Sequence, residues 1–368
     1  MVAENKYLED ITNNERFNFI GFATTPWHAL GLMASVYKIM ESGEKLFGTI
    51  YITPHSQTGY SIDHSFFPSI EGIKVERIQK SESIRDRFLK ILYSLYYLLR
   101  NGNSNKRSRQ IYVVEPWCIN SSLSGLLVKK IKDINLIHVV YDEGVSTYFS
   151  LKFNNSNIPT FIYNQFLKHI VFGKGFKYLS SKSNFVSAKL FAETNNGLVE
   201  NRTIIPYYFK ALSESPKRLH QTIEFGDNSV VICTTAWDRL EIKEDEDVEI
   251  IKTVERLLED MGYKVWFKPH PRDKNFKKLY PNVDILDNRI SIEGILLNCT
   301  KKPKAMISIS STILVTSKLF FGVKSVDLSK ILNAANIGKY VNEVSSFQKV
   351  FGNYVLEPEK IEDLRALI

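Results

Sequence analysis

The chain alternates short apolar runs of strand length with longer stretches of helical periodicity, and it does so in two series. In the first series, strands are expected at residues 17–23, 47–53, 73–78, 110–114 and 135–141. Helices are expected at residues 29–40, 84–100 and 121–131. Alternation of this kind predicts a parallel sheet with helices on both of its faces.

The pattern restarts after a helical, aromatic region at 158–176 and a polar stretch at 212–228 that contains Pro216 and Gly226. Strands are then expected at residues 229–234, 263–267, 305–309 and 324–327, and helices at 247–261, 290–298, 313–320 and 361–368. The predicted fold class is therefore α/β, with two Rossmann-like domains facing across a cleft. We place the domains at residues 1–212 and 213–368, and we leave open whether the C-terminal helix returns to the first domain.

Composition limits the partners. A length of 368 residues suits two domains of ordinary size, and the net charge is +8. Basic residues cluster at 106–109 and 168–182 in a chain rich in Tyr and Phe. Such a surface suits an acidic glycan or an anionic lipid, and no nucleic-acid-binding motif is present in the sequence.

Several features favour a cytoplasmic protein. The first residues are polar and charged, unlike a signal peptide, and the longest apolar stretch, 88–99, is interrupted by Lys90. The three cysteines are far apart and show neither a metal-binding nor a disulfide spacing. The helix at 84–100 with its basic tail can dock on the cytoplasmic face of the inner membrane; the alternative is a core helix followed by a basic loop.

Three polar motifs follow or overlap the ends of predicted strands, where ligands bind in open α/β sheets. The first is Asp142-Glu143-Gly144, after the strand at 135–141. Gly144 permits a tight turn, and a carboxylate held there can act as a general base. The alternative is an ordinary acidic turn or helix cap.

The second motif, Lys268-Pro269-His270-Pro271, follows the strand at 263–267. The two prolines restrict the backbone, so the imidazole is held in place, and an imidazolium can donate a hydrogen bond to a phosphate. Lys268 adds positive charge beside it. The alternative is a surface turn that happens to contain a histidine.

The third motif is the hydroxyl-rich segment 308–312, which ends one predicted strand and precedes a helix. Hydroxyls together with the amides of a helix N-terminus can bind an anion, although simple helix capping is an alternative. A separate Asp-x-Asp sequence, Asp245 to Asp247, has the form of a metal-binding motif. Its place before a helix favours the ordinary role of acidic residues in a first helical turn, so we expect no metal.

In combination, the motifs resemble those of bacterial sialyltransferases, specifically the lipooligosaccharide sialyltransferase and capsular polysialyltransferase group. Those enzymes carry an acidic-acidic-Gly motif, a His-Pro motif and a Ser/Thr-rich motif in this order. The matching residues here are Asp142-Glu143-Gly144, His270-Pro271 and Ser310-Ser311-Thr312. The segment 290–296 is similar to the family's ribose-binding segment, with Glu293 as its carboxylate, and Thr25-Pro26 matches a Thr-Pro pair after the first strand.

The resemblance implies the glycosyltransferase B arrangement and an inverting, metal-independent transfer of sialic acid from CMP-sialic acid to a hydroxyl of a cell-surface glycan. The acceptor is lipooligosaccharide or capsular polysialic acid, acidic or lipid-linked, and no further cofactor is implied. Asp142 is preferred as the base over its neighbour Glu143, and His270 acts on the departing phosphate. The donor-binding candidates are Thr234, Lys268, Pro271, Glu293, Ser310, Ser311 and Thr312, and the acceptor-side candidates are Thr25, Trp27, His28, Glu143 and Gly144.

Two other functions remain open. One is a glycerol- or ribitol-phosphate transferase of the teichoic acid type, which generally needs a second active-site histidine. The best candidates for it, His28 and His138, lie in the first domain. The other is a catalytically idle module that binds a glycan or a membrane.

Overall fold

The computed structural model describes most of both predicted domains. The described residues are 18–52, 62–77, 110–116, 136–142, 185–194, 197–215, 223–234, 244–270, 273, 276–287, 290–334, 347 and 350–368. The helices expected at 84–100 and 121–131, the region 158–176 and both basic clusters lie outside them. Among the candidate site residues, so do Glu143, Gly144 and Pro271.

The first sheet contains six strands, all parallel, in the order β3-β2-β1-β4-β5-β6. They are β1 (Phe19–Ala23), β2 (Gly48–Ile52), β3 (Ile73–Arg77), β4 (Ile111–Pro116), β5 (Leu136–Tyr141) and β6 (Phe185–Ser187). The first five confirm the predicted strands, whereas β6, only three residues long, was not predicted. The strand order reverses between β1 and β4, where open α/β sheets bind their ligands.

The second sheet contains five parallel strands in the order β11-β10-β9-β12-β13. They are β9 (Ser229–Cys233), β10 (Lys264–Lys268), β11 (Asp284–Ile285), β12 (Ala305–Ser308) and β13 (Lys324–Asp327). All but the two-residue β11 were predicted. Here the order reverses between β9 and β12, so the loops that follow these strands and β10 surround the expected ligand site.

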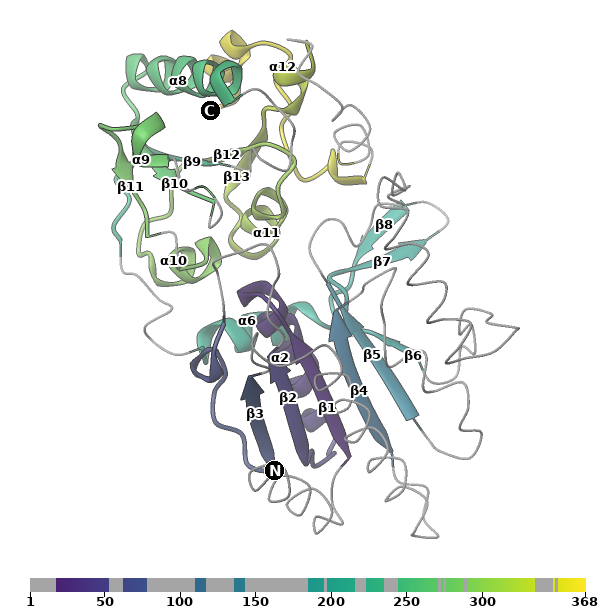
Figure 1. The fold of residues 1–368 in the computed structure, drawn as a ribbon. Helices are drawn as coiled ribbons and strands as arrows, with labels where there is room; N and C mark the ends of the chain where they lie inside the picture. The colour runs from purple at the N-terminus through teal and green to yellow at the C-terminus, as the bar shows by residue number, and fades with distance from the viewer. Residues whose placement is uncertain are drawn as a thin grey trace, which may run out of the picture.

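Helix α2 (Pro26–Glu41) packs against strands β1, β4 and β5 of the first sheet, and α6 (Ile205–Ser213) lies where the first domain meets the second (Figure 1). Helix α2 begins where Thr25 caps it and Pro26 occupies its first turn, a position that proline tolerates. Helix α6 packs against α2. The sequence placed the start of a linker at residue 212, but Leu212 is helical and buried, because α6 uses it to pack against its neighbours.

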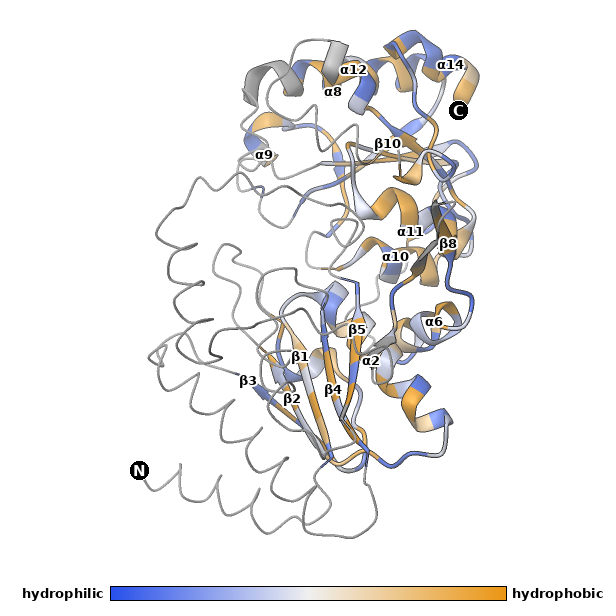
Figure 2. Cartoon of the chain, turned by 90° about the vertical axis from the view of Figure 1, so that its right-hand side faces the viewer, coloured by the Kyte–Doolittle hydropathy of each residue, from blue (hydrophilic) through white to orange (hydrophobic). Residues whose placement is uncertain are grey.

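The second sheet carries helices on two faces. These are α8 (Glu244–Asp260), α9 (Phe276–Leu279), α10 (Ile292–Asn298), α11 (Thr312–Phe321) and α12 (Ser329–Ala334). Asp245, Glu246 and Asp247 lie in the first turn of α8, as predicted. Helices α10 and α11 are largely apolar and lie between the second sheet and the first domain (Figure 2).

One continuous apolar cluster joins the two domains. The ring of Tyr208 on α6 lies 6.1 Å from that of Phe320 on α11, and Phe209 lies 5.1 Å from Phe320. A hairpin of β7 (Phe191–Thr194) and β8 (Gly197–Glu200) adds a second contact, because Phe191 packs against Phe351. The domains therefore share buried surface and a common core.

The C-terminal helix α14 (Leu364–Leu367) remains with the second domain. Leu364 and Ile368 belong to the second apolar cluster, and Lys324 Nζ donates to the carbonyl oxygen of Leu367 at 2.7 Å. The preceding segment, not the helix, reaches the first domain, where Tyr354 Oη donates to Glu200 at 3.2 Å. None of the described helices combines the length and apolar character that a membrane crossing requires.

Candidate active site

Asp142 follows β5 directly and is 1% exposed. Its Oδ2 atom accepts a hydrogen bond from the amide of Leu190 at 2.6 Å. Leu190 lies just after β6, so the segment that follows this unpredicted short strand supplies the donor that orients the carboxylate. Asp142 is thus a held, buried carboxylate, and Glu143 and Gly144 of the same motif lie outside the described residues.

Tyr208, which the sequence did not single out, lies beside Asp142. Burial and then the negative charge of Asp142 hold the pKa of the Tyr208 phenol well above its usual value. The tyrosine approaches α2 so closely that a Cβ atom on Gly31 would lie 2.9 Å from the Tyr208 hydroxyl oxygen and 2.4 Å from Cδ2 of Tyr141. A glycine is therefore required where α2 passes these two rings.

The three acceptor-side candidates on or before α2 lie in the same region. The amide of His28 donates to Thr25 Oγ1 at 3.2 Å, so the Thr25 hydroxyl caps the helix. The His28 ring lies 6.1 Å from that of Tyr141, and the Trp27 ring 5.6 Å from that of Tyr208. The fold thus gathers Trp27 and His28 around the end of β5, where Asp142 begins the acidic motif.

His138, the other histidine considered, is part of a pair inside the first sheet. Its Nε2 atom lies 2.6 Å from Oε1 of Glu115, across neighbouring strands β5 and β4. Both side chains are mostly buried. This arrangement suits a structural pair better than a second histidine facing a phosphate.

In the second domain, Thr234 positions the His-Pro motif. Its hydroxyl accepts a hydrogen bond from the amide of His270 at 3.0 Å and donates to Asp273 at 3.5 Å. The amide of Asp273 in turn donates to the carbonyl of His270 at 2.9 Å. Thr234 is buried, whereas His270 is half-buried, so the imidazole lies nearer to solvent than the residues that hold its backbone.

Lys268 and Glu293 are both buried, and Glu293 lies close enough to Lys268 to affect its pKa. Burial lowers the pKa of the Lys268 ammonium, and the nearby Cys233, Glu293 and Asp287 act in the opposite direction. Glu293 lies in the first turn of α10 and is 5% exposed. Its Oε1 atom accepts a hydrogen bond of 2.7 Å from Thr316 Oγ1 on α11, which fixes the carboxylate.

The hydroxyl motif forms the turn between β12 and α11. Ser311 caps α11, and its Oγ atom accepts from the amide of Ile313 at 3.4 Å. Ser310 has a φ of 41°, in the left-handed region that non-glycine residues rarely adopt. Ser310, Ser311 and Thr312 are all half-buried, so the turn lies near the surface at the point where the strand order of this sheet reverses.

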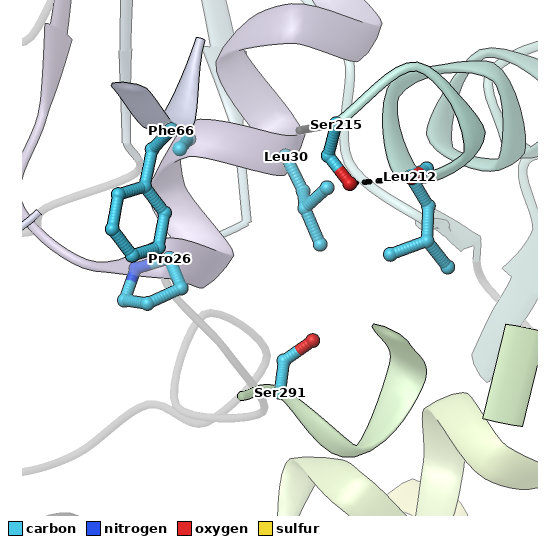
Figure 3. Close-up of a pocket in the computed structure, with 7 residues that line it drawn as sticks. Pro26, Leu30, Phe66, Leu212, Ser215 and Ser291 are labelled. Atoms are coloured by element: carbon cyan, nitrogen blue, oxygen red, sulfur yellow. Dashed lines mark hydrogen bonds between the residues drawn. The ribbon is translucent and has the colours of Figure 1, made fainter. Parts of the chain in front are cut away.

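A pocket lies between the domains next to the start of α10 (Figure 3). Pro26, Leu30 and Phe66 line it from the first domain, and Ser291 lines it from α10. The Ser291 hydroxyl caps α10 by accepting from the amide of Gly294 at 3.1 Å. The lining is mostly apolar and includes none of the predicted site residues, so this pocket does not replace the strand-end site.

The structure therefore gathers the described candidates into two groups, one at the carboxyl edge of each sheet. The first-domain group contains a held carboxylate with aromatic neighbours. The second-domain group contains a histidine, hydroxyls, a buried ammonium and a fixed carboxylate. Within the described part of the chain, no group of three or more His, Cys, Asp or Glu side chains is arranged to hold a metal ion.

The fold has relatives among solved structures. UDP-GlcNAc 2-epimerase from Methanocaldococcus jannaschii is 17% identical, with 95% of this chain and 90% of that chain covered and a TM-score of 0.53. A protein assigned as a UDP-N-acetylglucosamine 2-epimerase from Listeria monocytogenes is 13% identical over 95% and 86% of the chains, with a TM-score of 0.50. At such identities the likeness concerns the fold alone, and it agrees with two Rossmann-like domains in the glycosyltransferase B arrangement.

The wall teichoic acid polymerase TagF is also similar, with 10% identity over 99% of this chain and 84% of that chain, but a TM-score of 0.47 is too low to support an argument. Curated protein sequences include no significant match. The model of the alpha-2,8-polysialyltransferase (POLYST) family, in contrast, matches residues 20–330, a span that contains all three motifs. The chain therefore belongs to the alpha-2,8-polysialyltransferase family and is a sialyltransferase.

Proposed function

We propose that this protein is an inverting, metal-independent polysialyltransferase that extends a sialylated glycan with sialic acid from CMP-sialic acid. Family membership supports the donor and an acceptor that already carries sialic acid. The observation that carries the proposal is the family match across residues 20–330, combined with motif residues that lie at the carboxyl edges of two parallel sheets.

The second domain, residues 213–368, is the proposed donor domain. Glu293 binds the ribose hydroxyls of the cytidine, and Lys268 and Pro271 are assigned to the same donor-binding half of the site. His270 donates a hydrogen bond to the phosphate, and the turn that carries the hydroxyl motif at 310–312 contacts it. Donors placed where negative charge develops lower the barrier to departure of CMP. Thr234 holds the His270 backbone in place, because its hydroxyl accepts a hydrogen bond from the His270 amide.

The first domain, residues 1–212, is the proposed acceptor domain. Asp142 removes the proton from the 8-hydroxyl of the terminal sialic acid of the acceptor. The hydroxyl oxygen then forms a bond to C2 of the donor sugar while the bond between C2 and the phosphate oxygen breaks. CMP leaves with the bonding electrons, and the configuration at C2 inverts. A positioned carboxylate in this role contributes about 10²–10⁴-fold to the rate.

The acceptor and the place of action belong to the proposal too. An acidic polymer is favoured over lipooligosaccharide because the family name specifies the alpha-2,8 linkage. The net charge of +8 suits such a polymer, and it suits transient contact with anionic lipid at the cytoplasmic face of the inner membrane.

A panel of acceptors incubated with CMP-sialic acid tests the proposal. The panel contains short alpha-2,8-linked sialic acid oligomers, a sialylated lipooligosaccharide oligosaccharide and a neutral glycan, and product masses are recorded. We expect a ladder of products on the sialic acid oligomers, each one sialyl residue heavier than the last. A single addition on the lipooligosaccharide acceptor alone would contradict polymerisation, and turnover of CDP-glycerol in place of CMP-sialic acid would contradict the donor.

A further inference from the structure

We propose that Asp327 is a positioning residue for the donor phosphate: with Ser329, it holds Ser310 in the left-handed turn that precedes α11. This inference rests on the proposed function, in which the turn at 310–312 contacts the phosphate. It assigns a role to a buried carboxylate that belongs to none of the three motifs.

The contacts around Asp327 show how the turn is held. Asp327 ends β13, next to β12, and is 0% exposed. Its Oδ1 atom accepts from the amide of Ser310 at 2.9 Å, from the amide of Ser329 at 3.2 Å and from the hydroxyl of Ser329 at 2.5 Å. One carboxylate oxygen therefore ties the end of β12 to the segment that follows β13.

The backbone of Ser310 needs this support. Left-handed backbone angles bring the Cβ atom of an L-residue close to the following carbonyl, so a serine adopts them only when its surroundings compensate. The hydrogen bond from the Ser310 amide to Asp327 supplies that compensation at the residue with a φ of 41°.

The same contacts determine which way the hydroxyl of Ser310 points. Its Oγ atom lies 2.8 Å from Oγ of Ser329, and the Ser329 hydroxyl gives its single proton to Asp327. Because a serine hydroxyl has only one proton, Ser329 must be the acceptor in its bond with Ser310. The Ser310 proton therefore points inward, along a chain that runs from Ser310 through Ser329 to Asp327.

The residues of the hydroxyl motif therefore have different roles. Ser310 shapes the turn and presents oxygen lone pairs, whereas Ser311 accepts from the amide of Ile313 and keeps its own proton for a ligand. Direct donation to a phosphate oxygen then falls to Ser311 and its neighbour Thr312 at the start of α11. Asp327 acts on the donor through the turn and does not itself contact the phosphate.

Asp327→Ala and Asp327→Asn separate this role from a general effect on stability. Asn keeps an oxygen that can accept all three hydrogen bonds, whereas Ala keeps none. Val326→Ala is the matched control. Val326 lies next to Asp327 on the same strand and is equally buried, but its side chain belongs to the apolar cluster of the second domain. For each variant, CMP binding is measured by calorimetry, the donor KM and kcat by transfer assay, and folding by thermal denaturation.

We expect Asp327→Ala to weaken CMP binding and raise the donor KM by about tenfold or more, the effect of losing one charge-assisted hydrogen bond. For Asp327→Asn, CMP affinity and donor KM should remain within about threefold of the wild-type values, because Asn can accept the same hydrogen bonds. Val326→Ala should lower the denaturation temperature and leave CMP affinity unchanged.

Ser329→Ala provides an independent test if Asp327→Ala does not fold. It removes the relay between Ser310 and Asp327 while keeping the bond from the Ser310 amide, and we expect a smaller rise in donor KM. The inference would be overturned if Asp327→Ala bound CMP as tightly as Val326→Ala does. If Asp327→Ala does not fold, the same comparison is made with Ser329→Ala. Wild-type protein that neither binds CMP nor turns over CMP-sialic acid would overturn the proposed function, and the inference with it.

Discussion

The two halves of the candidate site are held in place by different interactions. In the second domain, side chains bond to the backbone of the functional loops: Thr234 holds the amide of His270, and Asp327 holds that of Ser310. In the first domain, Asp142 accepts a hydrogen bond from the amide of Leu190, and the neighbouring rings of Tyr208 and Trp27 pack against each other.

The difference suits the tasks proposed for the two halves. Hydrogen bonds require particular distances and angles, so loops held by them present donors at defined positions, as a phosphate requires. Aromatic packing excludes water and tolerates a range of ring angles, which suits the surroundings of a base. Variants in the second domain should therefore alter donor binding, and variants near Asp142 should alter transfer with little change in CMP affinity.

Asp142→Asn should have the largest effect. Asn keeps the shape and can still accept from Leu190, but it cannot take a proton, so transfer should fall by about 10²–10⁴-fold. CMP affinity, measured by calorimetry, should remain close to that of the wild type. Glu143→Gln is the matched control and should be milder. If Glu143→Gln is inactive and Asp142→Asn is active, Glu143 is the base. If both variants are active, the proposed mechanism is wrong.

His270→Ala should lower kcat by about 10²-fold or more, because it removes the proposed donor to the departing phosphate, and CMP affinity should fall as well. Thr234→Val makes the comparison sharper, since it keeps the imidazole and removes only the hydroxyl that holds the His270 amide. We expect an intermediate loss for Thr234→Val in steady-state transfer assays. Near-normal turnover by His270→Ala would reduce this motif to a structural turn.

Asp327 should make stability depend on pH. Burial raises the pKa of Asp327 from 3.8 to about 6. The hydrogen bonds from Ser329 and Ser310 lower this pKa, whereas the negative charge of Glu357, which pairs with Lys330, raises it further. The protonated form is thus favoured in the folded state, so its contribution to stability is present below pH 4 and is lost as pH rises through about 6.

The loss amounts to about 3 kcal/mol for a pKa difference of roughly 2 units. Asp327→Asn has no proton to lose at this position, so its stability relative to the wild type should increase between pH 4 and pH 7. Denaturant unfolding of both proteins across that range measures the difference. A constant difference would show that Asp327 titrates normally.

Glu293→Ala should raise the donor KM by about tenfold or more and change kcat less, because a carboxylate on the ribose acts equally before and during reaction. Thr316→Val keeps the carboxylate and removes the hydroxyl that fixes it, so we expect a rise in KM of only a few-fold. Initial-rate kinetics over a range of CMP-sialic acid concentrations distinguish the two. An unchanged KM in Glu293→Ala would exclude Glu293 as the ribose ligand.

Metal removal should have the smallest effect. The proposed phosphate ligands are protein donors, and Asp245 to Asp247 lie in a helical first turn, where acidic residues complement the helix dipole. Transfer in EDTA should therefore proceed at the rate seen without it. Activity that is lost in EDTA and restored only by Mg²⁺ or Mn²⁺ would overturn this expectation.

The sequence predicted much of the fold because its signals are local. The apolar runs at 229–234 and 305–309 and the helical periodicity of 247–261 identify their elements without knowledge of their neighbours. The elements it missed are short or placed by contacts: β6 has three residues, and α6 is identified by its packing on α2. The roles of the individual site residues remain predictions until the variants are measured.

The residue pattern alone determined that two α/β domains form, and it determined the order of the three motifs along them, since both depend on nearby residues. Only the tertiary structure decided which residues orient the motifs. Asp327 and Ser310, Thr316 and Glu293, and Leu190 and Asp142 are separated by 17, 23 and 48 positions, respectively. A hydrogen bond requires atoms within about 3 Å, and over such separations that proximity arises from the packing of whole elements, which no local pattern encodes.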